Sequence, residues 1–229
     1  MVVQRARQVH EKEERRQAIL GAALELFVEL GFQRMTMTQI AQKSKFAKGT
    51  IYIYYKTKEE LFLHLTEAGL LEFFESLDEA LIASREPLDP ESLSALVLQS
   101  LDSQPQLPRL LSILHTMLEH NVDRLTVLKF REFLATRVNR SGRHLERRLP
   151  FLCPAQGVDL ILLIHCLVLG TWQVSDSAPV VKACLDAPGL HIFDRPFGPL
   201  FSSSLAALVS GLRSQADSPD SAIEIPARS

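Results

Sequence analysis

The chain has 229 residues, of which 46% are hydrophobic and 23% charged, and its formal net charge is −2 at pH 7. These values are typical of a soluble globular protein with a sizeable core, and they exclude a chain too polar to fold. The overall charge does not indicate a nucleic-acid binder, but its distribution does. Residues 1–65 hold 11 Lys and Arg against 7 Asp and Glu, whereas the remainder holds 14 against 20. We therefore expect only the basic N-terminal part to meet a polyanion.

The cysteines and the apolar segments bear on location. Cys153, Cys166 and Cys184 are widely spaced and odd in number, which argues against a disulfide framework and favours a reducing cytoplasm. The N-terminal segment is polar, unlike a signal peptide. The most apolar run, residues 160–174, is shorter than the ~20 residues of a membrane-spanning helix. We expect a cytoplasmic protein without membrane contact.

The first predicted element after a flexible basic arm, residues 1–12, is a helix over about residues 13–30. Its apolar residues recur at steps of three and four, which places them on one helical face. Gly31 is expected to end this helix in the left-handed conformation. The apolar residues of that face are Ile19, Ala23, Leu26, Phe27 and Leu30.

Two short helices are predicted next, over residues 39–44 and 48–54, joined by a turn at residues 45–47. Thr38 is expected to cap the first of them. The second is crowded with Lys, Thr and Tyr, and no acidic residue lies between Thr36 and Lys58. Such a segment indicates a helix-turn-helix whose second helix lies in the major groove of DNA.

Small and polar side chains in this segment are candidates for DNA contacts. Ala47 and Gly49 keep the start of the second helix slim, and Ile51 and Tyr55 are expected to face inward because they are four residues apart. Exposed Ile53 suits a thymine methyl group. The expected donors to phosphate are Thr38, Thr50, Tyr52, Tyr54, Lys48, Lys56 and Lys58, and the expected base contacts are Ala47, Lys48, Thr50 and Ile53, with Gln39 at the edge.

The remainder of the chain shows helical periodicity without sustained two-residue alternation, which predicts an all-α fold. A long helix over residues 58–84 is expected to run without a break, since no proline occurs between Gly49 and Glu86. The polar tail, residues 214–229, is expected to be disordered. Further helices are predicted at about residues 91–101, 108–120, 122–149, 157–174 and 198–213, and a short one at residues 179–186 is left open.

The segment from Ala22 to Phe62, AALELFVELGFQRMTMTQIAQKSKFAKGTIYIYYKTKEELF, resembles the DNA-binding domain of the TetR/AcrR family of bacterial transcriptional regulators. The resemblance implies a helix-turn-helix domain over residues 13–58, followed by a helical ligand-binding and dimerisation domain over residues 59–213. It also implies an operator of double-stranded DNA and a homodimer formed by the helices at about residues 157–174 and 197–213. The residues that the resemblance implies as contacts to the DNA phosphate backbone are Thr36 or Thr38, Lys48, Thr50, Tyr52, Tyr54 and Lys58.

The turn departs from the family's usual Gly-Val-Ser, because it reads Lys45-Phe46-Ala47. Loss of the glycine predicts a non-glycine residue at positive φ, at a cost of about 1 kcal/mol. Loss of the serine removes the hydroxyl that would cap the second helix. Lys45 is added to the candidate phosphate contacts.

Polar groups among apolar residues of the C-terminal helices suggest a site for a hydrophobic or amphipathic effector. His115 and Glu119 share a helical face and are equally well explained as a surface pair. The candidate effector-binding residues are His115, Met117, Glu119, Phe130, Phe133 and Trp172.

We interpret the chain as a homodimeric, sequence-specific DNA-binding regulator, a repressor released from a pseudo-palindromic operator by a small molecule. The alternative is a ligand-independent or activating DNA-binding protein of the same fold. An all-α enzyme is disfavoured, because no nucleophile–base pair, metal cluster or Gly-rich phosphate loop is evident. Adjacent His165 and Cys166 point about 100° apart on a helix, so no metal site or cofactor is expected.

Overall fold

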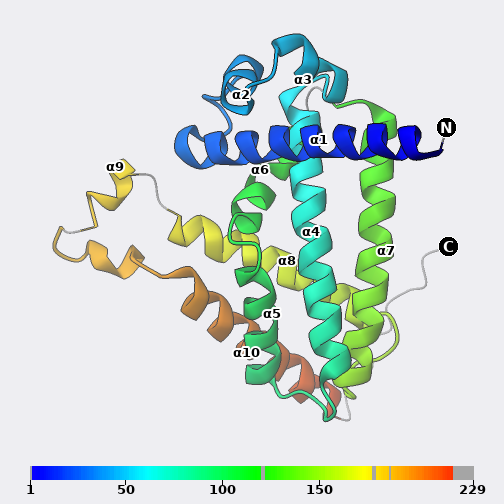
Figure 1. Ribbon diagram of the computed structural model, residues 1–229. Helices are drawn as coiled ribbons and strands as arrows, with labels where there is room; N and C mark the ends of the chain where they lie inside the picture. The colour runs from blue at the N-terminus through cyan, green and yellow to red at the C-terminus, as the bar shows by residue number, and fades with distance from the viewer. Residues whose placement is uncertain (1, 120–121, 177–178, 186, 219–229) are drawn as a thin grey trace. The chain divides into compact units, whose positions relative to one another are not determined.

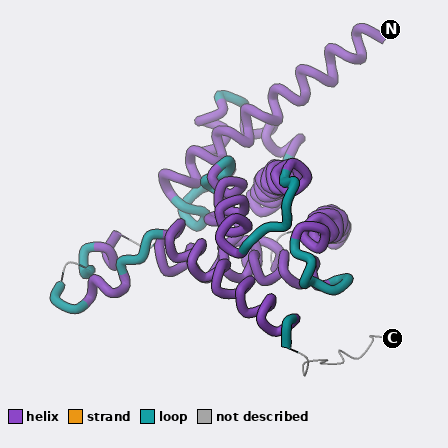
Figure 2. Tube along the Cα trace, turned by 90° about the horizontal axis from the view of Figure 1, so that it is seen from below, coloured by secondary structure: helices purple, strands orange, loops and turns teal. Residues whose placement is uncertain are grey.

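The computed structural model describes residues 2–119, 122–176, 179–185 and 187–218, and all regular structure in these ranges is helical (Figures 1 and 2). The predicted all-α fold is therefore confirmed. The helices in chain order are α1 (Val2–Leu30), α2 (Met37–Ser44), α3 (Lys48–Tyr54), α4 (Lys58–Ala83), α5 (Pro90–Asp102), α6 (Leu107–Glu119), α7 (Arg124–Arg148), α8 (Gln156–Ser175), α9 (Pro179–Lys182), the 3-10 helix η1 (Leu190–Phe193) and α10 (Phe197–Ala216).

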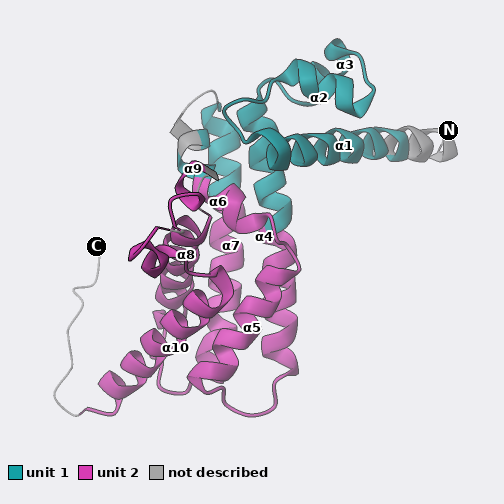
Figure 3. Ribbon diagram, turned by 90° about the vertical axis from the view of Figure 1, so that its left-hand side faces the viewer, with its two compact units in different colours: residues 1–69, 113–131 teal, residues 70–112, 132–229 magenta. Residues whose placement is uncertain are grey.

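The chain divides into two compact units, which Figure 3 colours separately. Unit 1 comprises residues 1–69 and 113–131, and unit 2 comprises residues 70–112 and 132–229. The domains predicted from the sequence are continuous ranges, whereas each of the two units consists of two separate segments. The predicted domain boundaries stay predictions. The expectation that α4 is one unbroken helix is confirmed, and the division falls within it, between Gly69 and Leu70.

The core of unit 1 forms around the apolar face of α1, where Ile19, Ala23 and Phe27 are buried as predicted. The rings of Phe27 and Phe32 each meet the ring of Phe62 on α4 edge to face, with centroids 5.2 Å apart. Such aromatic pairs add about 0.5–1.5 kcal/mol to the free energy gained from burial alone. They fix α1 and the loop after it against the start of α4.

The N-terminal helix begins at Val2, so residues 2–12, expected as a flexible arm, are helical in the structure. No glycine or proline occurs before Gly21, and the segment is rich in Gln, Arg and Glu, which favour helices. The helix ends as predicted, since Gly31 has φ 74° and its N–H donates to the carbonyl of Phe27.

In unit 2, α5 and α10 pack against each other through apolar residues spaced by four, and α8 packs on α10. The hydroxyl of Ser94 donates to the carbonyl of Ser202 over 2.9 Å, which joins α5 and α10 by a polar contact as well. The buried residues of α5 are Leu93, Val97 and Leu101, and those of α10 are Phe201, Leu205 and Val209.

The close approach of α7 and α8 requires glycine at two positions. A Cβ added to Gly157 would lie 2.1 Å from the carbonyl oxygen of Gly142, so any side chain there would force the backbones of α7 and α8 to shift. The N–H of Gly157 also donates to Oε1 of Glu146 over 3.1 Å. The contact therefore fixes the start of α8 against α7.

The length of α8 corrects one expectation. The helix has 20 residues, and within the described part of the chain it is long and apolar enough to cross a membrane. The helix predicted over residues 157–174 extends by one residue at each end, to Gln156 and Ser175, so α8 is longer than the apolar run of residues 160–174. This finding is weak evidence for a membrane span, since a core or interface helix of a soluble protein passes the same test.

Two smaller expectations concern the C-terminal region. The polar tail was predicted from residue 214, but α10 continues to Ala216, and residues 219–229 lie outside the described part of the chain. The short helix left open at residues 179–186 appears as α9, which ends at Lys182, and residue 186 is not described. The three cysteines are exposed and form no disulfide.

Candidate nucleic-acid interface

The helix α2 begins with a reciprocal cap formed by Thr36 and Gln39. The Thr36 hydroxyl accepts a hydrogen bond from the Gln39 N–H over 3.3 Å, and the Thr36 N–H donates to Oε1 of Gln39 over 2.9 Å. The prediction that Thr38 is the cap was wrong, because Gln39 lies three residues after Thr36, the spacing that a capping box needs. Thr38 lies inside α2 and is exposed.

The turn between α2 and α3 has the two features expected from its unusual sequence. Lys45 has φ 59° in the left-handed region, and the N–H of Phe46 donates to the carbonyl of Ala41 over 3.1 Å. Ala47 precedes α3 without a side-chain cap. The turn thus reaches the usual backbone geometry with a strained lysine in place of glycine.

The recognition helix α3 has one buried face and one exposed face. Ile51 is fully buried and Tyr55, which follows the helix, is 1% exposed, as predicted. Ile53 is 79% exposed and Tyr52 is 44% exposed. Buried Ile51 fixes the rotation of the helix, so the exposed face is set by packing inside unit 1.

The lysines around α3 differ in whether an intrachain group holds them. Lys45, Lys48 and Lys56 are exposed. Lys43 instead forms ion pairs with Glu29 at 2.5 Å and Glu25 at 3.1 Å, and these hydrogen bonds raise its pKa. Three exposed cations and no acidic side chain in residues 36–58 make this surface suited to phosphate.

Lys58 has an intrachain role that the sequence did not reveal. Its ammonium donates to the carbonyl of Phe32 over 3.0 Å and lies 4.4 Å from the centroid of the Phe32 ring. Its contact with DNA stays a prediction, as do those of the other candidates. Of these, Thr36, Thr38, Ala47, Gly49, Tyr52 and Ile53 are exposed, and Gln39, Thr50 and Tyr54 are half-buried.

A second cap, which the sequence analysis missed, starts α4. The Thr57 hydroxyl accepts from the N–H of Glu60 over 3.1 Å, and the Glu60 carboxylate accepts from the N–H of Lys56 over 2.9 Å. The signal was present in the order Thr57-Lys58-Glu59-Glu60, a threonine three residues before a glutamate. The Glu60 carboxylate, which lies close to the recognition helix in the sequence, is thus held by a hydrogen bond to the backbone.

The six candidate effector-binding residues do not come from one unit. His115, Met117 and Phe130 belong to unit 1, whereas Phe133 and Trp172 belong to unit 2. Met117 and Phe130 are buried, and His115 is exposed. Trp172 packs edge to face on Phe197, with centroids 5.6 Å apart. The assignment of these residues, with Glu119, to an effector site stays a prediction.

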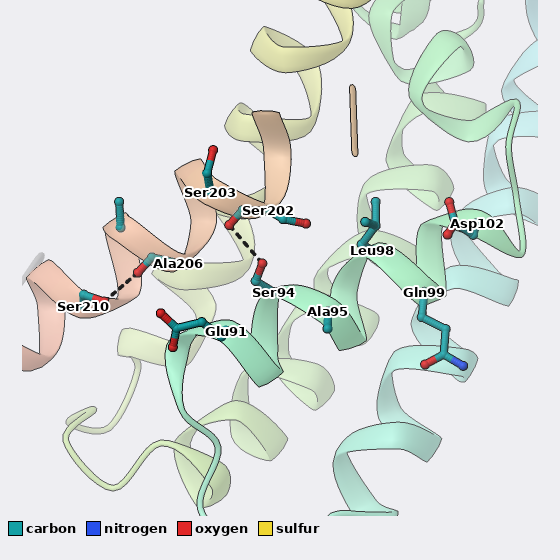
Figure 4. A pocket seen from close by; sticks show the side chains of 11 residues that line it. Glu91, Ser94, Ala95, Leu98, Gln99, Asp102, Ser202, Ser203, Ala206 and Ser210 are labelled. Carbon is teal, nitrogen blue, oxygen red and sulfur yellow. Dashed lines mark hydrogen bonds between the residues drawn. The ribbon is translucent and has the colours of Figure 1, made fainter. Parts of the chain in front are cut away.

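An open groove of about 660 Å³ lies between α5 and α10 in unit 2 (Figure 4). Its lining is mostly small or polar, so it differs from the apolar cavity expected for a hydrophobic effector. None of the candidate effector residues borders it. The groove is lined by Glu91, Ser94, Ala95, Leu98, Gln99, Asp102, Ser202, Ser203, Ala206, Ala207 and Ser210.

A capped short helix, a tight turn and a recognition helix with a basic exposed face define a DNA-binding helix-turn-helix protein with a helical body. Comparison with protein-family models agrees with this class of protein. The model described as bacterial regulatory proteins, tetR family, matches residues 19–65, and the model described as tetracyclin repressor-like, C-terminal domain, matches residues 67–216. The second match covers more than half of the chain, so this chain belongs to the TetR family of bacterial transcriptional regulators.

Curated relatives match short stretches of the chain. The chain is 36% identical over 69 residues to the uncharacterised HTH-type transcriptional regulator YfiR of Bacillus subtilis, which covers 30% of this chain and 34% of that protein. It is 45% identical over 47 residues to the HTH-type transcriptional regulator QacR of Staphylococcus aureus, covering 20% and 25%. The chain thus spans about a third or less of the length of the curated relatives it matches.

Solved structures match over nearly the whole chain. A putative TetR-family regulator from Syntrophomonas wolfei has a TM-score of 0.58 at 17% identity and covers 89% of this chain and 96% of that one. Thermus thermophilus FadR, a TetR-family repressor in complex with lauroyl-CoA, has a TM-score of 0.53 at 23% identity, covering 93% and 99%. At these identities the likeness shows the fold.

Proposed function

We propose that the protein is a homodimeric repressor that binds a pseudo-palindromic operator and is released from it by a hydrophobic or amphipathic small molecule. The observation that carries DNA binding is the exposed face of α3, with Ile53 outward and Lys45, Lys48 and Lys56 around it. One such helix reads few base pairs. Two copies related by a two-fold axis would read two half-sites about 34–36 Å apart.

The outward faces of α8 and α10 support the homodimer. On α8, Leu162 is 52% and Leu163 is 39% exposed among the residues that the structure describes. Large exposed apolar side chains in so apolar a helix are typical of a surface that a partner covers. On α10, the exposed residues Ser203, Ala207 and Ser210 recur at steps of four and three and are small. A small-residue face lets a partner helix approach closely, and the exposed leucines of α8 supply apolar area.

Release by an effector requires that the ligand favour one of two states of the protein. The helix α4 is the natural carrier of such a change, since it begins four residues after α3 and contributes residues to both units. Lauroyl-CoA, which the Thermus FadR structure holds, is amphipathic and therefore serves as the first probe. A ligand-independent or activating regulator is the second candidate function.

Selection from a pool of random-sequence duplexes tests the proposal. Enrichment of a two-fold symmetric site, bound by two protomers in sedimentation, is the expected result. Enrichment of an asymmetric site bound by one protomer would contradict the homodimer, and uniform recovery of all sequences would contradict specific recognition. Titration of the bound complex with lauroyl-CoA and other amphipathic molecules then separates a releasable repressor from the ligand-independent alternative.

A further inference from the structure

Three side chains from separate elements of unit 1 meet beside the C-terminal end of the recognition helix. Arg16 on α1 donates from Nε to the hydroxyl of Tyr55 over 3.1 Å, and its Nη2 lies 3.0 Å from Nδ1 of His64 on α4. The rings of Tyr55 and His64 meet edge to face, with centroids 5.5 Å apart. Tyr55 caps α3, since its N–H donates to the carbonyl of Ile51. One guanidinium thus bridges α1, the end of α3 and α4.

The chemistry of arginine decides which tautomer of His64 this bridge requires. A guanidinium has five N–H donors and no acceptor. Nδ1 of His64 must therefore accept the hydrogen bond, which places the single proton of the neutral ring on Nε2. A protonated imidazole has an N–H at both nitrogens and cannot accept from Arg16.

A second partner is in place for the protonated form. The Glu67 carboxylate, one turn further along α4, lies 3.5 Å from the same Nδ1 atom of His64. Arg16 and Glu67 therefore compete for one nitrogen. When the ring is neutral, Nδ1 accepts from Arg16, and when the ring is protonated, Nδ1–H donates to Glu67 and repels the guanidinium.

We propose that Arg16 and His64 are positioning residues for DNA recognition, which hold the end of α3 through Tyr55 only while His64 is neutral, so that acid weakens operator binding. The proposal rests on the proposed function as a DNA-binding regulator. It assigns no contact with DNA to any of the three residues.

The charged groups around His64 come from two helices. Lys12, Glu13 and Arg16 on α1 line the same hollow of about 430 Å³ as His64, together with Ile53, Tyr54 and Tyr55. Glu60 and Glu67 on α4 act on the ring as well. Burial, followed by the charge of Arg16, lowers the pKa of His64 below 6.5, against the opposing effect of the two glutamates. The neutral, bridging form is therefore the one present at neutral pH.

The expected change in operator affinity on acidification is opposite to the change that general electrostatics predicts. Acidification makes a protein more cationic, and a more cationic protein binds the DNA polyanion more tightly. Loss of specific binding in acid therefore points to a change in the position of α3, whereas simple charge titration predicts a gain.

The test measures operator affinity by fluorescence anisotropy from pH 8 to pH 5 at fixed salt, with a selected symmetric duplex. His64→Asn supplies an amide oxygen near the position of Nδ1 that accepts from Arg16 without titrating. We expect the wild-type protein to lose about tenfold or more in affinity, which corresponds to about 1.4 kcal/mol, and His64→Asn to lose none. The control is His191→Asn, which replaces an exposed histidine in unit 2 and should retain the wild-type profile.

A second variant keeps the proposal testable if His64→Asn fails to fold. Tyr55→Phe preserves the buried ring and removes the hydroxyl that accepts from Arg16. It should weaken operator binding at pH 8 at unchanged helix content in circular dichroism. Identical pH profiles for wild type and folded His64→Asn, or full affinity in Tyr55→Phe, would overturn the proposal. Failure of the wild-type protein to bind any selected duplex at pH 8 would instead contradict the proposed function.

Discussion

Removal of one exposed lysine from the recognition helix should reduce the salt dependence of operator binding by a predictable amount. Lys48 is exposed at the first position of α3, and its ammonium lies 5.9 Å from the centroid of the Tyr52 ring, free of any acidic partner in residues 36–58. Each phosphate contact contributes about 0.9 to the slope of log affinity against log salt. A homodimer loses two contacts in Lys48→Ala, so its slope should fall by about 1.8.

The assay measures affinity for the operator duplex between 50 mM and 200 mM salt. A decrease of 1.8 in slope means that the variant loses about twelvefold less affinity over this range than the wild type. Lys43→Ala is the matched control, because Glu25 and Glu29 already pair with Lys43. Equal changes of slope in Lys48→Ala and Lys43→Ala would refute the assignment, and a decrease of only about 0.9 would refute the dimer.

Three further predictions concern the free energy of unfolding. Gly157→Ala should lower it by about 1–3 kcal/mol, because the added Cβ meets the carbonyl of Gly142, whereas Gly21→Ala, with open space around it, should not. Lys45→Gly should raise the thermal midpoint by relieving a positive φ, a gain of up to about 1 kcal/mol, and an unchanged midpoint would argue against strain there. Burial lowers the pKa of His64 in the folded state. The stability that neutral His64 contributes to the fold is therefore present above pH 6.5 and is lost as pH falls through the folded-state pKa. Urea midpoints measured from pH 7.5 to 5.5 should therefore fall less in His64→Asn than in the wild type.

The parts of the fold that sequence could predict are those set by local spacing. The four-residue step from Ile51 to Tyr55 was enough to assign the buried face of α3, and the loss of glycine at Lys45 was enough to predict a positive φ. The cap of α2 was misplaced because Thr36 and Thr38 both have suitable hydroxyls, and only the reciprocal bond from Gln39 separates them.

Contacts between residues far apart in the chain were not predictable. Nothing in the sequence pairs Arg16 with His64, since 48 positions separate them and each is an ordinary polar residue on its own helix. The same holds for Lys58, which sequence assigned to phosphate and which the structure places over the ring of Phe32. Spacing along a helix reports which face a residue occupies, but the partner of that face depends on the tertiary fold.

Footprinting on the DNA upstream of the protein's own coding region shows whether the protein binds a specific operator. The salt concentration should be fixed at a moderate value, because phosphate-driven binding changes steeply with salt. We expect one protected, two-fold symmetric site with half-sites about one helical turn apart. Protection of all sequences alike, or no protection at a concentration where the protein is folded and dimeric, would contradict this expectation.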